Sequence, residues 1–176
     1  MELSTPYPWV DLDIMEQNIR TQTQSLRAYG IAHRPHIKTH RSIEIARMQL
    51  AAGAKGITCA KLAEAMVMAQ AGIRDILLAY PLVGEDKMRR LGALLDMAEV
   101  TVTVDNLLAA RQLSNLGVSK QKKVHVLVEI CTPIERGGVQ EQSVLPFVRE
   151  LLQLPGLAFK GLFSYSGLSQ KLGTPE

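Results

Sequence analysis

Short apolar runs alternate with longer amphipathic segments along the chain. The apolar runs are expected to form strands, and they cover residues 34–40, 56–61, 75–80, 100–105, 124–130 and 159–167. Segments with apolar residues at helical spacing lie between them, at residues 14–29, 43–52, 62–71, 86–97, 107–116 and 143–152. Asp13 is expected to cap the first helix, and Gly30 to follow its end. This alternation predicts an α/β fold, in which helices lie outside a parallel sheet.

Two features favour a parallel (β/α) barrel of the TIM type over an open doubly wound sheet. No glycine-rich phosphate turn follows an early strand, as a dinucleotide fold would need. Polar residues also share one strand face, such as Thr101 and Thr103, or His125 and Glu129. Helices on both faces of a sheet would bury these groups at high cost, whereas a barrel interior can collect them near its mouth.

The predicted barrel is incomplete in this chain. About six strands are expected in its 176 residues, whereas a closed barrel has about eight strands and about 250 residues. We therefore expect residues 1–176 to be the N-terminal part of a (β/α)8 barrel, with the C-terminal barrel strands absent.

Charge and composition narrow the classes of partner. The formal net charge is +3, and Lys and Arg are scattered along the chain, so no nucleic-acid partner is expected. No apolar run reaches the roughly 18 residues of a membrane span, and no secretory signal begins the chain. We therefore expect a cytoplasmic protein with no membrane partner. Cys59 and Cys131 lie in apolar segments, which favours buried thiols over a disulfide.

The stretch "RPHIKTH" places His36, Lys38 and His40 at alternate positions. In an extended strand these side chains would share one face, and Ile37 and Thr39 would take the other. Lys38 would then end the first barrel strand, at the side where barrel active sites are built. An amine held there among basic groups is a candidate nucleophile toward an aldehyde. Taken alone, the position also fits a surface lysine at a strand end.

Several segments resemble a known enzyme family. The segments "STPYPWVDLDIMEQNI", "RPHIKTHRSIEIARMQLAAGAKGITCAKLAEA" and "AGIRDILLAYPLVG" are similar to the N-terminal barrel of alanine-racemase-type (fold type III) pyridoxal 5'-phosphate (PLP) enzymes. They are closest to the D-threonine aldolase and D-serine dehydratase branch. The resemblance implies that Lys38 is the catalytic residue, joined to PLP as a Schiff base, with His36 beside it in the cofactor site.

Two later segments carry further implied cofactor contacts. "VLVEICTPIERGGV" resembles the family segment after the fifth strand, and its arginine, Arg136, would face the pyridine ring of PLP. "GLFSYSGLSQ" resembles the sixth-strand segment, which implies that Tyr165 and Gln170 line the cofactor pocket. Cys131 and Leu168 depart from the family pattern, which usually has Asp and His at these positions.

Three further charged residues lie at or near the ends of expected strands. Glu129 is expected to point into the barrel and to form a structural ion pair with an inward Arg or His. Lys61 ends the second expected strand and is either a family-like site residue or a loop charge. Asp105 ends the fourth, and it could equally cap a helix that begins at Asn106.

The resemblance implies a PLP-dependent lyase that acts on β-hydroxy D-amino acids, in the manner of D-threonine aldolase, to give glycine and an aldehyde. The alternatives are β-elimination of the D-serine dehydratase type, a PLP-binding carrier, an inactive truncated remnant, or a lysine-dependent aldolase without a cofactor. It further implies a small-molecule D-amino acid substrate and a homodimer. A divalent metal is expected in the full-length family, with its ligands in a C-terminal β domain that this sequence lacks.

Overall fold

The computed structural model describes residues 5–132 and 136–165. Its helices are α1 (Leu12–Ala28), α2 (Ile43–Ala51), α3 (Leu62–Gln70), α4 (Glu85–Leu95), α5 (Leu107–Ser119) and α6 (Val144–Leu152). Its strands are β1 (Ile57–Cys59), β2 (Asp75–Leu78), β3 (Glu99–Val104), β4 (Val124–Ile130) and β5 (Leu157–Ser164). Two 3-10 turns are η1 (Ile37–Thr39) and η2 (Glu141–Ser143).

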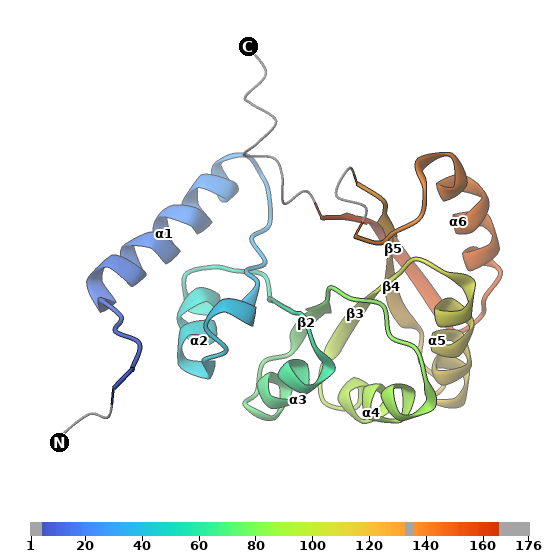
Figure 1. The fold of residues 1–176 in the computed structure, drawn as a ribbon, viewed down its shortest axis with the longest axis horizontal. Coiled ribbons are helices and arrows are strands. Elements are labelled where there is room, and N and C mark those ends of the chain that lie inside the picture. Colours follow the sequence, from blue (N-terminus) through green and yellow to red (C-terminus); the bar gives the residue numbers. More distant parts are fainter. Residues whose placement is uncertain (1–4, 133–135, 166–176) are drawn as a thin grey trace, which may run out of the picture.

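The five strands form one parallel sheet in the order β1-β2-β3-β4-β5, which is their order along the chain. Right-handed crossovers between strands in sequential order place every connecting helix on the same side of the sheet. Figure 1 shows α3, α4, α5 and α6 arranged in this way. A doubly wound sheet would instead reverse its strand order at a switch point. The arrangement confirms the α/β prediction and corresponds to part of a (β/α) barrel.

The segment Arg34–His40 is not the strand that its pattern predicts. Among these residues only His36 makes a bridge, a parallel one with Thr58 of β1, and η1 follows at once. The reason is local, because the His36 side chain accepts a hydrogen bond from the backbone N–H of Lys38. That bond favours a tight turn over a sheet ladder. Ile37 is fully buried and Thr39 is exposed, so the predicted alternation of faces is also wrong.

The two faces of the sheet differ in chemistry, as the sequence predicts. One row of paired residues is apolar and buried, and it packs with the helices in a single core: Cys59, Leu78, Val102 and Val126. The neighbouring row points to the other face and is more polar. In it Thr101 pairs with His125, and Thr103 and Glu129 lie further along the same face.

Helix boundaries follow the cap residues, with two corrections. Asp11 caps α1, rather than Asp13, and its carboxylate accepts a hydrogen bond from the N–H of Ile14 at 3.1 Å. Gly30 follows the end of α1 with φ of +69°, as predicted. Asn106 caps α5 by accepting from the N–H of Ala109 at 2.8 Å, so Asp105 does not serve as the cap.

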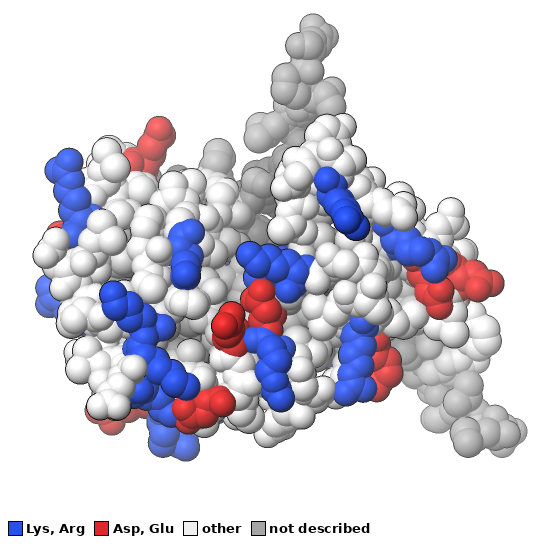
Figure 2. Space-filling view, turned by 180° about the vertical axis from the view of Figure 1, so that it is seen from behind, with Lys and Arg blue, Asp and Glu red and all other residues white. Residues whose placement is uncertain are grey.

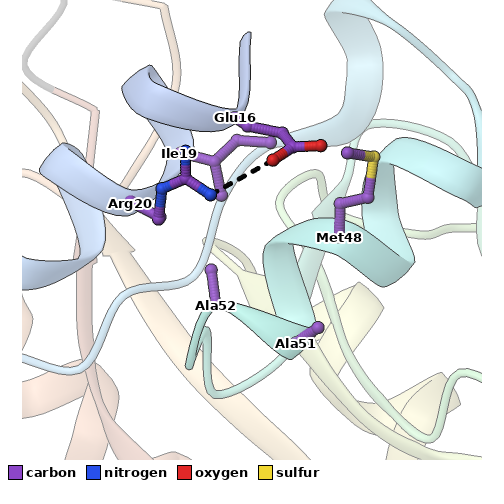
Figure 3. A pocket seen from close by; sticks show the side chains of 6 residues that line it. All are labelled: Glu16, Ile19, Arg20, Met48, Ala51 and Ala52. Carbon is purple, nitrogen blue, oxygen red and sulfur yellow. Dashed lines mark hydrogen bonds and ion pairs between the residues drawn. The ribbon is translucent and has the colours of Figure 1, made fainter. Parts of the chain in front are cut away.

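Helix α1 packs beside α2 at one end of the molecule (Figure 1). Figure 3 shows the small cavity between them, where Glu16, Ile19 and Arg20 of α1 face Met48 and Ala51 of α2. The buried residue of α1 is Thr23, whose hydroxyl lies 2.9 Å from Nδ1 of His33. None of the side chains in this cavity belongs to the expected cofactor site.

The surface carries charge of both signs. Figure 2 shows Lys and Arg side chains lying among Asp and Glu side chains on one face, without a single continuous basic surface there. None of the helices in residues 5–132 and 136–165 combines the length and the apolar character needed to cross a membrane.

Candidate functional site

Four of the five expected cofactor-site residues line one cavity of about 380 Å³. These residues are His36, Lys38, Arg136 and Tyr165. Ala79, just after β2, and Ser164, which ends β5, also line it, so the cavity opens at the carboxyl ends of the strands. This is the end at which barrel enzymes build their sites. Gln170 and Leu168 lie outside the described residues.

Lys38 projects toward this cavity from the turn η1. Its Nζ lies 5.8 Å from the centroid of the Tyr165 ring. The carbonyl oxygen of Ile37 accepts from the N–H groups of His40 and Arg41, at 3.2 and 2.8 Å. Because Ile37 is completely buried, it anchors the turn in the core while Lys38 stays exposed. The amine is therefore accessible on a fixed backbone.

Arg136 lies between two aromatic rings. Its Cζ is 4.5 Å from the centroid of Tyr165 and 5.7 Å from that of Tyr80. Stacking on ring faces orients a guanidinium and leaves its N–H edges free for an anion. Tyr80 was not predicted from the sequence as a site residue. It is an exposed aromatic residue just after β2, in "LLAYP", and this position at the carboxyl end of a strand was the available signal.

Backbone hydrogen bonds hold the segment that carries Arg136 against the end of β4. The N–H of Cys131 donates to the Val139 carbonyl at 2.9 Å, and the N–H of Val139 donates to the Glu129 carbonyl at 2.8 Å. Asp105 accepts from the N–H of Gly138 at 3.4 Å. Gly138 has φ of +104°, and a Cβ there would lie 2.5 Å from the Cys131 nitrogen. Only glycine fits this close approach.

A second cavity of about 320 Å³ shares Arg136 with the first, and Tyr80, Asp105 and Glu129 also line it. Glu129 is 5% exposed, and burial raises the pKa of its carboxyl. The positive charge of Arg136 opposes this shift, and the Asp105 carboxylate adds to it. Within the described residues Glu129 makes no ion pair, so the predicted pairing is wrong for this part of the chain. The Arg136 charge acts on Glu129 without direct contact.

His36 lies at the edge of the site, and its surroundings lower its pKa. Burial lowers its pKa most, and the positive charge of Lys38 lowers it further. Glu64 opposes these effects, and Arg136 adds a smaller lowering. Lys61 is exposed at the start of α3 and does not line the cavity, which fits its interpretation as a loop charge.

A comparison against known families places the chain in one of them. The family model described as "Alanine racemase, N-terminal domain" matches residues 10–175. The chain belongs to this family. Among curated members, D-threonine aldolase from Arthrobacter sp is 38% identical over 99% of this chain and 46% of the relative. D-threo-3-hydroxyaspartate dehydratase from Delftia sp. (strain HT23) is 33% identical over all of this chain and 47% of the relative.

A solved structure of a relative is also similar to this chain along nearly all of its length. The crystal structure of D-threonine aldolase from Filomicrobium marinum superimposes with a TM-score of 0.91 and 36% identity, over 95% of this chain and 46% of that one. This chain therefore spans about half the length of the relatives that it matches. In residues 5–132 and 136–165, no three His, Cys, Asp or Glu side chains cluster closely enough to hold a metal ion.

Proposed function

We propose that this chain binds PLP covalently through Lys38 and forms the N-terminal barrel part of a lyase for β-hydroxy D-amino acids. The observation that carries the proposal is the accessible Lys38 amine, which shares one cavity with Arg136 and Tyr165. The relatives named D-threonine aldolase, D-threo-3-hydroxyaspartate dehydratase and D-serine dehydratase support the class of reaction and substrate.

The residues present fit the chemical groups of PLP. An aldehyde needs a primary amine, a flat aromatic ring fits beside a ring face, and an anionic group needs a cation. Lys38, Tyr165 and Arg136 supply these three features, in that order, in a cavity of about 380 Å³. This volume lies in the range of ligand sites, about 300–1,000 Å³.

PLP and the residues of this chain would supply different parts of the chemistry. When bound, PLP supplies an electron sink for the bonds at Cα of an amino acid. Nζ of Lys38 would hold PLP through its aldehyde carbon, with loss of one water, and the Lys38 amine would be placed to accept a proton when it is free. Arg136 would face the pyridine ring of PLP, and its positive charge would offset negative charge on the bound group.

Within the lyases, we propose aldol cleavage of D-threonine type, in which the Cα–Cβ bond breaks and the β-hydroxyl loses its proton. The products are glycine and an aldehyde. The higher identity to D-threonine aldolase, 38% against 33%, supports this choice. The 33% relative, a dehydratase, supports elimination as the second candidate, which gives a 2-keto acid and ammonia.

A titration with PLP tests the binding proposal. PLP added to the purified chain should produce a yellow absorbance band that borohydride abolishes. Lys38→Ala should remove the band, whereas Lys61→Ala, the matched change at an exposed lysine outside the cavity, should keep it. A band that survives Lys38→Ala would overturn the assignment.

A product assay with D-threonine then separates the two reactions. Glycine and acetaldehyde would support aldol cleavage, and 2-oxobutanoate and ammonia would support elimination. L-threonine is the control, because a lyase for D-amino acids should leave it unchanged. Cleavage of both enantiomers at the same rate would contradict the substrate class.

A further inference from the structure

We propose that His36 and His40 are positioning residues that hold the Lys38 turn through a repeated hydrogen bond, in which Nδ1 of each imidazole accepts from the backbone N–H two residues later. The proposal rests on the proposed role of Lys38, and it adds a role for the two histidines that flank it. In this view the histidines serve Lys38 through the backbone rather than through contact with a ligand.

The same bond occurs on both sides of Lys38. The N–H of Lys38 donates to Nδ1 of His36 at 3.3 Å, and the N–H of Ser42 donates to Nδ1 of His40 at 3.1 Å. Asn and Asp make the equivalent bond in turns, where a side-chain oxygen accepts from the N–H two residues on. Two such bonds within one short segment fix both the entry to η1 and its exit toward α2.

The backbone between these bonds needs outside support. Arg41 has φ of +50°, an unfavourable conformation for a residue with a Cβ. Its Nε lies 3.2 Å from Oε1 of Glu64. Oε2 of Glu64 in turn accepts from the N–H groups of Ala60 and Lys61, at 2.9 and 3.2 Å. The turn is thus tied to the start of α3, and the two histidine bonds act on the backbone beside Lys38 in addition to this tie.

The bonds require one form of each ring. An imidazole accepts through Nδ1 only when it is neutral and its proton is on Nε2, because a protonated ring donates from both nitrogens. Burial lowers the pKa of His40 most, and the nearby Gln49 side chain partly opposes this lowering. Nε2 of His40 and Oε1 of Gln49 are both buried, and neither atom has a hydrogen-bond partner among the described residues, so a proton on Nε2 would have a free acceptor available. The surroundings therefore fit the tautomer that the turn needs.

The charges around each ring set how the turn should respond to acid. His36 faces Lys38 on its own turn, Arg136 after β4 and Glu64 on α3, whereas His40 faces the side chain of Gln49 and the backbone of Ser42. Burial is the largest effect for both histidines and lowers their pKa below the ordinary 6.5. Both rings therefore accept hydrogen bonds at neutral pH and lose them in more acidic solution.

Paired variants separate the hydrogen bond from the bulk of the ring. His36→Leu removes the acceptor, whereas His36→Asn supplies an oxygen that can accept the same N–H but does not titrate. His40→Leu and His40→Asn form the second pair. Amide hydrogen exchange measured by NMR, at Lys38 for the first pair and at Ser42 for the second, reports each bond without any ligand. The Leu variants should exchange about fivefold faster than wild type, since a side-chain cap contributes about 1 kcal/mol, and the Asn variants should restore the protection.

Covalent attachment of PLP at Lys38, trapped with borohydride between pH 5 and pH 8.5, is the second readout. The ratio of the wild-type rate to the His36→Asn rate should fall about fivefold once the pH is below the lowered pKa of His36, because only the wild type loses its bond. This ratio tests the positioning role of His36 even if a Leu variant fails to fold. A constant ratio, or exchange in folded Leu variants equal to wild type, would overturn the positioning role. Absence of PLP on wild-type Lys38, with exchange that still depends on the histidines, would overturn the proposed function alone.

Discussion

The guanidinium of Arg136 lies over the ring of Tyr165, with 4.5 Å between Cζ and the ring centroid. The hydroxyl of Thr132 also donates to the Tyr165 carbonyl at 2.9 Å, so the ends of β4 and β5 are joined at this point. Lys38 approaches the same ring from η1. The Tyr165 ring therefore lies near both Lys38, the proposed covalent residue, and Arg136.

Replacement of the Tyr165 ring should weaken PLP binding. Tyr165→Leu removes the surface on which Arg136 stacks, whereas Tyr165→Phe keeps it. A cation–π contact at an exposed site contributes about 0.5–1 kcal/mol, so Tyr165→Leu should raise the PLP dissociation constant about two- to fivefold. Absorbance titration checks this. Equal losses in the Leu and Phe variants would show that the hydroxyl, and not the ring face, matters.

Two adjacent glycines offer a matched test of the segment that holds Arg136. Gly138→Ala forces a Cβ against the Cys131 nitrogen at positive φ, whereas a Cβ at Gly137 meets only Asp105 at 3.6 Å. Gly138→Ala should therefore lower the free energy of unfolding by about 1–3 kcal/mol and weaken PLP binding. Gly137→Ala should change stability by less than about 0.5 kcal/mol. Urea unfolding measures both, and equal stabilities would contradict the close packing seen at Gly138.

Most elements of the fold are predictable from the sequence because tertiary packing agrees with local pattern. The apolar runs at β1 to β5 and the helical spacing of α1 to α6 each match an observed element. Arg34–His40 fails because an alternating pattern cannot show that a histidine will accept its neighbour's N–H. That choice between turn and strand depends on a side-chain hydrogen bond, which periodicity does not contain.

The site was only partly predictable, for a related reason. Lys38, Arg136 and Tyr165 come from segments far apart in the chain, and only the family resemblance placed them together before the structure did. Tyr80 has no motif of its own, and its importance comes from its distance to Arg136. The ion pair expected for Glu129 is not found among the described residues, where burial instead raises the pKa of its carboxyl, an outcome that the sequence pattern does not distinguish.

Glu129 should make stability depend on pH in a defined direction. Burial raises the pKa of its carboxyl above the ordinary 4.5, so the folded state favours the protonated form. Below pH 4.5 this preference contributes its full stability, and the contribution is lost as pH rises through the raised pKa. Glu129→Gln, which stays neutral, should therefore gain stability relative to wild type as pH rises from 4 to 8. Urea unfolding across this range tests the sign, and a relative loss toward pH 8 would contradict it.

The two cysteines should differ strongly in reactivity. Both are free thiols, but Cys59 is completely buried, and burial raises its pKa to about 12. Cys131 is only half-buried. Because the thiolate is the reactive form, an aromatic disulfide reagent should modify Cys131 in the native protein and Cys59 only after unfolding. Cys131→Ser is the control and should leave the native protein unreactive, and rapid labelling of Cys59 in that variant would contradict the buried position.

Peptide mapping of the borohydride-reduced PLP adduct tests most directly whether PLP bonds to Lys38. The chain is incubated with PLP, reduced, digested and analysed by mass spectrometry. We expect one dominant modified residue, Lys38, in the peptide that contains "RPHIKTH". Modification that falls mainly on Lys61, or that is spread evenly over the exposed lysines, would contradict it.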